Sequence, residues 1–203
     1  MTDEIIILDG SRKLHVDNTL QVLKNIENLR NTPQRVWKSW DQNFINSLIT
    51  PAYNPNRNQV DVYELGAQMS LNRWLHRENA AALKVVLMDQ DMYDSRRSNM
   101  NFGYGVNLPF ESGSTYAVIS TARLKDEAHA RHVLAHELGH AFGAPNSSRR
   151  DIYESLGAHC GDKNCTMHQE LNGESYYEQA LRIVRLGRDY CSSCTRDIQR
   201  FVK

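Results

Sequence analysis

Residues 136–143 read His-Glu-Leu-Gly-His-Ala-Phe-Gly and fall within a stretch that has the pattern of a helix. We expect that helix to run over residues 125–142 and to end at Gly143. Residues four apart on an α-helix differ by about 40° in direction and about 6 Å in height, so His136 and His140 point to one side. Two imidazoles placed in this way can bind a single metal ion.

Glu137 directly follows the first of these histidines, on the flank of the same helix face. A carboxylate in that place stays outside the first coordination shell and can take a proton from a water that the metal binds. Zinc with three protein ligands keeps a fourth position for that water and acidifies it toward neutrality. The pattern therefore predicts a catalytic zinc site with Glu137 as general base. A histidine-rich, solvated helix face is the alternative, because His129 and His132 lie on the same stripe.

The rest of the chain alternates between strand and helix patterns, which predicts an α/β fold with a mixed, twisted sheet beside the histidine-bearing helix. Continuous apolar runs predict buried strands at residues 4–8, 84–88 and 116–121. Residues 16–29 have helical spacing. Residues 31–59 carry several prolines and asparagines, so they are expected to be mostly loop with short ordered pieces.

Four further segments have weaker patterns. Residues 60–79 favour a helix or a series of helical turns, and residues 101–105 favour a short edge strand within a loop. Residues 146–173 are expected to be irregular, and the chain from Cys191 onward is expected to form a short tail.

Length and charge exclude several classes of protein. The chain has 203 residues, of which 24 are basic and 24 acidic, so its formal net charge is zero. A neutral chain has no general positive field for phosphate backbones or anionic lipid, so we expect neither a nucleic-acid nor a membrane partner. The N-terminus lacks the basic start and the long apolar core of a signal peptide. We therefore expect a cytoplasmic protein. We also expect it to be a monomer.

All four cysteines lie in the last quarter of the chain, at Cys160, Cys165, Cys191 and Cys194. In a reducing compartment, clustered thiolates more often hold metal than form disulfides. Cys191 and Cys194 form the closely spaced Cys-x-x-Cys pair that structural zinc favours. Cys160 and Cys165 form a more widely spaced pair. Two disulfides, or four buried free thiols, are the alternatives. The energy of such a zinc site is folding energy, so a small carboxy-terminal lobe could depend on it.

Downstream of the helix, a third histidine stands directly before a cysteine, at His159 and Cys160. Four residues separate that cysteine from Cys165, and Met167 stands two positions later. Together with residues 136–143 and the distal Cys-x-x-Cys, this order of residues resembles the archaemetzincins, a subfamily of the metzincin zinc peptidases.

The resemblance, which covers residues 80–195, implies a zincin-like α+β fold in two parts. Residues 1–143 would form an amino-terminal subdomain with the active-site helix, and residues 144–203 would form a small zinc-tied subdomain. The resemblance also implies two zinc ions, one catalytic and one structural. The ligands that it implies are His136, His140 and His159 for the catalytic ion and Cys160, Cys165, Cys191 and Cys194 for the structural ion.

The activity that the resemblance implies is zinc-dependent hydrolysis of peptide bonds, with Glu137 as general base and Met167 beneath the ligands. The implied partner is a peptide or protein substrate that pairs antiparallel with an edge strand. Residues 101–106 are the predicted edge, beside residues 115–121. Two other functions stay open: a non-catalytic, zinc-stabilised binding module and a zinc hydrolase of non-peptide amides.

The chain departs from the archaemetzincin pattern in the spacing of its third histidine. The family places that residue three positions after the glycine, where this chain has Asn146. His159 follows only after an insertion of about a dozen residues, which must loop out at a cost that grows only logarithmically with length. Zinc accepts oxygen as well as nitrogen, so three carboxylates are alternatives for the third ligand. They are Asp151, Glu154 and Glu170.

Residues 144–158, which we call the insertion, contain Arg149 and Arg150. These arginines could border the substrate site and favour acidic or small substrates, or the insertion could be a surface loop. Tyr176 and Tyr177 are candidates for a hydrogen bond to the oxyanion, although packing in the core is the more common role of a tyrosine.

Overall fold

A computed structural model gives the structure of the chain, and it describes residues 4–11, 15–30, 35–39, 42–72, 75, 83–96, 103–109, 115–154, 157–170 and 173–201. The chain divides into two compact units. The unit that contains residues 136–143, called the histidine unit, comprises Asp17–Thr32 and Leu124–Lys203. The other, called the sheet unit, comprises Thr2–Val16 and Pro33–Arg123. The functional division into residues 1–143 and 144–203 stays a prediction.

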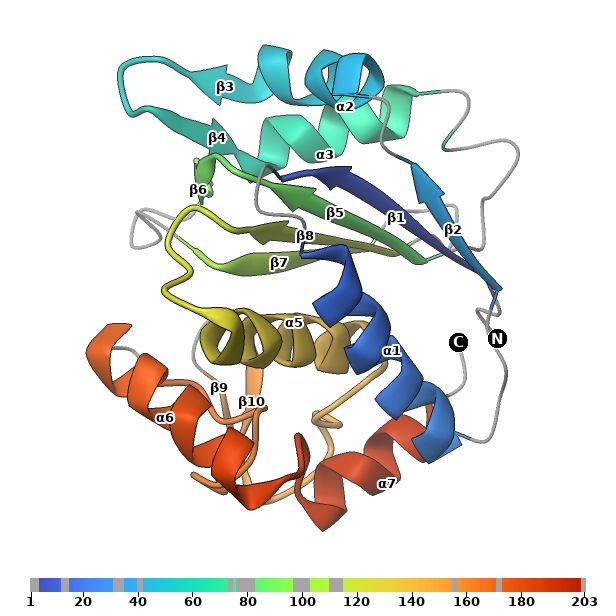
Figure 1. The fold of residues 1–203 in the computed structure, drawn as a ribbon, viewed down its shortest axis with the longest axis vertical. Helices are drawn as coiled ribbons and strands as arrows, with labels where there is room; N and C mark the ends of the chain where they lie inside the picture. The colour runs from blue at the N-terminus through green and yellow to red at the C-terminus, as the bar shows by residue number, and fades with distance from the viewer. Residues whose placement is uncertain are drawn as a thin grey trace. The chain divides into compact units, whose positions relative to one another are not determined.

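The sheet unit is built on a five-stranded sheet with the order β2-β1-β5-β8-β7 (Figure 1). The first four strands in that order run parallel, and β7 runs antiparallel to β8, so the predicted mixed sheet is confirmed. Continuous apolar runs suit central parallel strands, which explains why the sequence located three of them correctly. The strands are β1 (Glu4–Gly10), β2 (Arg35–Ser39), β5 (Leu83–Met88), β7 (Gly105–Pro109) and β8 (Thr115–Ser120).

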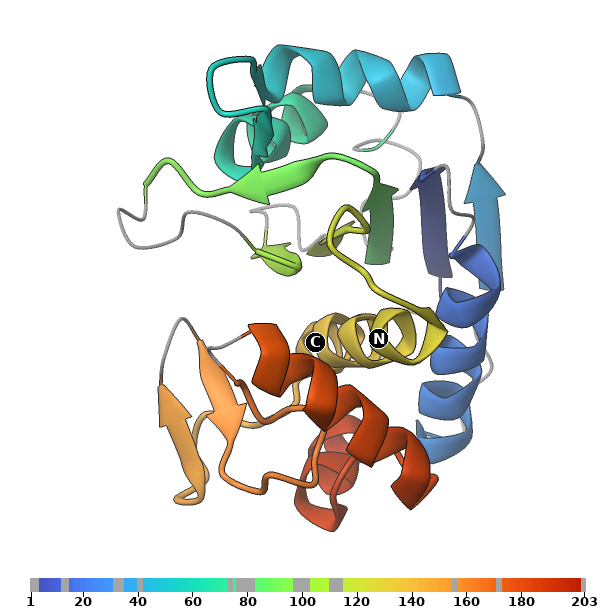
Figure 2. The same ribbon diagram turned by 60° about the vertical axis from the view of Figure 1, so that its left-hand side comes forward.

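Helices α2 (Gln42–Ile49) and α3 (Val62–Leu71) lie on one face of this sheet (Figures 1 and 2). The expectation of mostly loop over residues 31–59 is wrong for α2, because Ile45, Leu48 and Ile49 form a buried stripe at helical spacing. These side chains join a core whose other members are Ile6, Leu8, Ala52, Val60, Val62, Leu65, Met69, Leu75, Val86, Met88, Met92, Tyr116 and Val118.

A short 3-10 helix (η1, Thr50–Ala52) and a three-stranded sheet complete the sheet unit. That sheet has the order β3-β4-β6, and β4 pairs antiparallel with β3 and parallel with β6. Its strands are β3 (Tyr53–Asn54), β4 (Gln59–Asp61) and β6 (Asp91–Tyr93).

The edge strand predicted over residues 101–105 lies farther along the chain. Residues 101–102 fall outside the described residues, and Gly103 makes a single bridge to Met92. The edge strand itself is β7, which begins at Gly105 and has β8 as its neighbour. Pairing of a substrate with this edge stays a prediction.

The histidine unit contains helices α1, α5, α6 and α7 and a hairpin of β9 and β10 (Figure 2). Helix α5 begins after Asp126, whose side chain accepts a hydrogen bond from the His129 amide at 2.9 Å. It ends before Gly143, whose φ of 77° is the left-handed conformation that glycine adopts most readily. The elements are α1 (Val16–Arg30), α5 (Glu127–Ala141), β9 (Ile152–Glu154), β10 (Ala158–Cys160), α6 (Gly173–Leu186) and α7 (Ser192–Arg200).

Two sequence expectations for this unit are wrong. The segment expected to be irregular contains the β9–β10 hairpin, and the expected tail contains α7, which buries Cys194 and Ile198. The loop before α7 is tied to two other helices, since Asp189 accepts hydrogen bonds from Asn25 of α1 at 2.9 Å and Arg131 of α5 at 3.3 Å. None of the described helices combines the length and apolar character that a membrane crossing requires.

Candidate metal centres

Three histidines form the first candidate centre, called the histidine site. Helix α5 carries His136 and His140 one turn apart, and β10 carries His159. One ring nitrogen from each of the three lies within 4.8 Å of the others. The Nε2 atoms of His136 and His140 are 3.2 Å apart, and the His159 ring centroid lies 5.3 Å and 5.1 Å from the centroids of those two rings.

Backbone groups fix the orientation of these imidazoles. The Nδ1 atom of His136 lies 2.7 Å from the Thr166 carbonyl oxygen, and Nδ1 of His159 lies 3.0 Å from the Gly157 carbonyl oxygen. A carbonyl oxygen can only accept, so Nδ1 is the donor in both pairs and Nε2 is the atom that would bind a metal. The Ala144 backbone makes a hydrogen bond to His140. Such bonds to the second ring nitrogen are characteristic of histidines that hold metals.

The geometry of the histidine site fits zinc. Tetrahedral ligands with Zn–N bonds of about 2.0–2.1 Å lie about 3.3 Å apart, close to the spacing of the two α5 nitrogens. Burial, with the neighbouring His159, lowers the pKa of His136 to about 4, and burial also lowers the pKa of His140. Both rings are therefore neutral near pH 7, which is the form that binds a metal. Three imidazoles leave one tetrahedral position for water or substrate.

The carboxylates weighed as third ligand are placed elsewhere or not described. Asp151 accepts hydrogen bonds from Arg149, and Glu170 lies 3.5 Å from Nε2 of His168. The side chain of Glu154 is outside the described residues. The geometry therefore favours His159.

A β-hairpin delivers the third histidine. Strand β9, within the insertion, pairs antiparallel with β10 and sets Tyr153 opposite His159, with their ring centroids 5.8 Å apart. The Tyr153 hydroxyl donates to the Gln169 carbonyl at 2.6 Å and accepts from the Gln169 amide at 2.7 Å. The insertion does not simply loop out, as the sequence suggested. It forms half of the hairpin that carries the ligand.

Glu137 and Met167 flank the histidine site. Glu137 is buried, and that burial raises the pKa of its carboxyl to about 8. Met167 is fully buried against α5, where a Cβ atom at Gly139 would collide with the methionine sulfur. The glycine within the His-Glu-Leu-Gly-His sequence therefore allows the close approach of Met167 to the helix.

The solvated-helix alternative is wrong, because His129 and His132 are buried. The ring of His132 packs edge-on against Tyr176 at 4.7 Å, and the same tyrosine ring lies 6.2 Å from that of His136. Tyr177 has a different role, since its hydroxyl donates to Asp126, the residue that caps α5.

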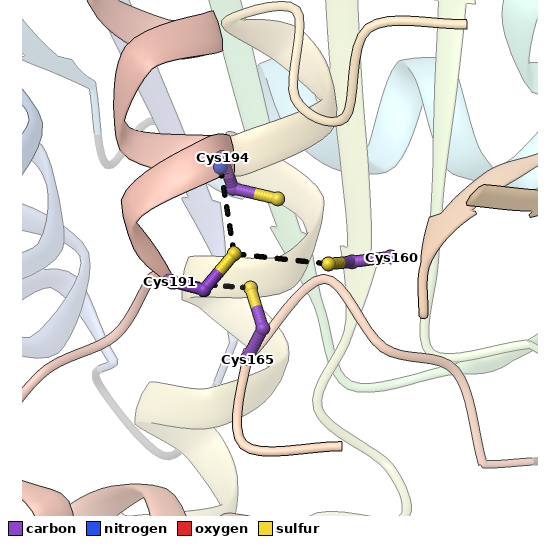
Figure 3. Close-up of side chains that lie close together, drawn as sticks. All are labelled: Cys160, Cys165, Cys191 and Cys194. Atoms are coloured by element: carbon purple, nitrogen blue, oxygen red, sulfur yellow. Dashed lines mark hydrogen bonds between the residues drawn. The ribbon is translucent and has the colours of Figure 1, made fainter. Parts of the chain in front are cut away.

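The four cysteines form the second candidate centre, called the cysteine site (Figure 3). Their sulfur atoms point toward one another and lie within 4.8 Å of one another, and all four thiols are free and buried. The sulfurs of Cys160 and Cys191 are 3.8 Å apart. Tetrahedral zinc with Zn–S bonds of about 2.3 Å places its sulfurs about 3.8 Å apart, so this site also fits zinc. The structure contains neither of the disulfides that were the alternative.

Known proteins resemble this chain in sequence and in fold. The chain is 31% identical to the archaemetzincin of Nanoarchaeum equitans over 147 residues, which cover 72% of this chain and 66% of that protein. In sequence, the chain is similar to the archaemetzincins. It spans just under two thirds of the length of that relative. The sequence matches no protein-family profile.

Two solved structures share the fold of the archaemetzincin-like chain. The archaemetzincin of Methanopyrus kandleri superposes with a TM-score of 0.62 at 20% identity and covers 98% of this chain and 94% of its own. A zinc-dependent peptidase of Methanocorpusculum labreanum superposes with a TM-score of 0.57 at 18% identity and covers 96% of this chain and 99% of its own. The expected fold class is thereby confirmed.

Two pairs of adjacent residues connect the two sites of the archaemetzincin-like chain. His159 belongs to the histidine site and the next residue, Cys160, to the cysteine site. Cys165 belongs to the cysteine site, and the carbonyl of the next residue, Thr166, orients His136. No pattern in the sequence pointed to Thr166, because its contribution is a backbone carbonyl that any residue supplies.

Proposed function

We propose that this protein is a zinc-dependent peptidase of the metzincin type that holds two zinc ions, one in each site. The observation that carries the proposal is the convergence of three backbone-oriented imidazoles, two buried and one partly buried, beside a buried carboxyl group. The names of the relatives, an archaemetzincin and a zinc-dependent peptidase, support the same activity. A peptide or protein is the proposed substrate. The cytoplasmic location and the monomeric state stay predictions.

Zinc in the histidine site would supply a Lewis acid that acidifies a water ligand and polarises the scissile carbonyl. Glu137 would take a proton from the attacking water and pass it to the leaving amine. Burial raises the pKa of Glu137 to about 8, toward neutral pH, which suits a group that both accepts and returns a proton. His136, His140 and His159 would hold the ion, oriented by their backbone hydrogen bonds.

Burial of Glu137 argues for a catalytic role over a binding module. An ionisable group that leaves water costs stability, and a site that serves only to hold a metal does not need a carboxyl there. Hydrolysis of non-peptide amides would use the same residues, so the substrate screen must decide between these two activities.

The test compares the wild type with Glu137→Gln, which keeps the side-chain shape but cannot act as a base. Glu178→Gln, at an exposed position on α6, is the matched control. Zinc per chain is measured by mass spectrometry, and cleavage is measured on a peptide library and on simple non-peptide amides. We expect two zinc ions in all three proteins and a rate lower by about 10²–10⁴ in Glu137→Gln alone.

Each other outcome has a definite meaning. Full cleavage by Glu137→Gln with zinc retained would exclude this residue as the base. A wild type that binds two zinc ions but hydrolyses nothing would favour the binding module. Cleavage of the amides without cleavage of peptides would favour the other hydrolase.

A further inference from the structure

The guanidinium group of Arg149, in the insertion, lies against the cysteine site. Its Nη1 atom is 3.3 Å from the sulfur of Cys194, and its Nη2 atom is 3.7 Å from the sulfur of Cys160. The side chain is only 14% exposed. One planar group thus touches two sulfurs that come from different elements, β10 and α7.

Two carboxylates hold the guanidinium in this place. Asp197 of α7 accepts from Nη1 at 2.7 Å and also accepts from the Asn146 amide at 3.0 Å. Asp151 accepts from Nε at 2.8 Å and from Nη2. The hydrogen bonds to Asp151 and then Asp197 raise the pKa of Arg149, so its positive charge persists at every relevant pH. The planar fork of arginine suits such a set of acceptors, which a lysine cannot reproduce.

The sulfur of Cys194 differs from the other three sulfurs in the kind of group that donates a hydrogen bond to it. Backbone amides donate to the other sulfurs: Asp162 to Cys160 at 3.5 Å, Cys191 to Cys165 at 3.3 Å, and Cys194 to Cys191 at 3.5 Å. The donor to Cys194 in the described residues is the Arg149 side chain. A substitution can remove this donor without changing the backbone donors.

Four thiolates around a divalent cation carry a net charge of minus two. Donors to the sulfurs spread that charge, and a thiolate that accepts a hydrogen bond is a weaker nucleophile. Outer groups of this kind also orient the ligands of a metal. Asp197 and Asp151 offset much of the positive charge of the guanidinium, so its effect on the sulfurs depends on direct N–H···S contact.

We propose that Arg149 is a positioning residue of the cysteine site, which shields the Cys194 thiolate and makes the insertion part of that metal centre. The inference rests on the proposed zinc in the cysteine site. It replaces the idea that both arginines face the substrate, because Arg149 is committed to the sulfurs and their neighbours. Arg150, next in sequence and exposed, provides a matched control.

The test measures alkylation of each cysteine in the folded, zinc-loaded protein with iodoacetamide, located by peptide mass spectrometry. The chain has only four cysteines, so the reagent reports on this site alone. The variants are Arg149→Gln, Arg149→Lys and Arg150→Gln. Loss of a hydrogen bond to a charged group changes an equilibrium by about tenfold or more. We therefore expect the alkylation rate of Cys194 to rise by about tenfold in Arg149→Gln. We expect a smaller rise in Arg149→Lys and none in Arg150→Gln.

A second variant, Asp197→Asn, covers the case that Arg149→Gln does not fold. It keeps both sulfur contacts possible but weakens the partner that orients Nη1, so we expect a smaller rise in the alkylation rate of Cys194. Equal rises at all four cysteines would indicate general loosening and overturn the proposal, as would unchanged rates in both variants. A wild type without zinc in the cysteine site would instead overturn the proposed metal centre, which zinc analysis of the wild type detects independently.

Discussion

The histidine site and the cysteine site share a segment of chain but are organised in opposite ways. Two ligands of the histidine site lie one turn apart on a 15-residue helix, and their rings are held by backbone groups. The ligands of the cysteine site come from a strand end, a loop and the start of a nine-residue helix. The first site is largely organised by local helical geometry, whereas the second would depend on a bound metal to hold these three segments together.

This difference predicts a one-way dependence between the sites. Cys160 and Cys165 adjoin His159 and Thr166, so a metal in the cysteine site would position both the third ligand and the group that orients the first. The histidine site does not position a cysteine in the same way, because α5 is formed by its own hydrogen bonds and cap. The cysteine site, with four protein ligands, would thus determine the geometry of the histidine site, which has three.

Cys191→Ser should change the protein more than any other variant considered below. Serine is a good helix N-cap, so it preserves the start of α7 while removing a metal ligand. We expect loss of the cysteine-site zinc, weaker zinc binding at the histidine site and a fall in peptidase rate of about 100-fold, since outer groups that orient ligands contribute about 10–100-fold each. His159→Gln should lose only the histidine-site zinc. The number of zinc ions per chain is measured in both variants. Normal zinc binding at the histidine site in Cys191→Ser would refute the one-way dependence.

The next effect concerns the buried histidines of α5 that are not in the histidine site. Burial lowers the pKa of His132 to about 3 and that of His129 to about 4. Both are neutral when folded but bind protons in the unfolded chain below about pH 6.5, so stability falls as the pH drops from about 6.5 toward 4. Each histidine lowers the free energy of unfolding by up to about 1.4 kcal/mol for each pH unit of that fall.

His132→Phe should therefore make the pH dependence of stability shallower over that range. Urea unfolding of the zinc-free protein at several pH values measures the slope without a contribution from metal release. An unchanged slope in His132→Phe would show that this histidine is not neutral in the folded protein.

Gly139→Ala tests the packing beneath the histidine site. A Cβ atom there collides with the Met167 sulfur and lies 3.0 Å from the Tyr190 ring, and overpacking of this kind costs about 1–3 kcal/mol. We expect a lower melting temperature and weaker zinc binding at the histidine site, while the cysteine-site zinc is retained. The cost should shrink in a Met167→Ala background. An equal cost in both backgrounds would show that the methionine is not the obstacle.

The smallest expected effect is that of Tyr153→Phe. It removes the hydroxyl that links β9 to Gln169, which should reduce stability by about 1 kcal/mol and loosen the hairpin that carries His159. Competition with a chelator should show zinc affinity lowered several-fold at the histidine site alone. Tyr63→Phe, at an exposed position of the sheet unit, is the control and should change neither quantity.

Much of the histidine unit could be predicted because its signals are local. The spacing of His136 and His140, the glycine at the end of α5 and the Cys-x-x-Cys pair each depend on a few consecutive residues. The stripe of α2 was also local, but the prolines and asparagines around it favoured loop. Helix α7 was missed because its apolar face is small and lies close to the chain end.

Two central elements of the chemistry could be predicted from neighbouring residues alone: a helix that carries two imidazoles on one side, and a set of thiols able to hold a metal. The folded chain was needed to show that His159 lies with those imidazoles, that β9 pairs with its strand, and that Arg149 faces the sulfurs and not the solvent. Local periodicity follows from backbone geometry and can be read from neighbouring residues. Contacts across the insertion depend on chain closure and on the pairing of distant groups, which many arrangements of the same residues would satisfy until the whole unit folds.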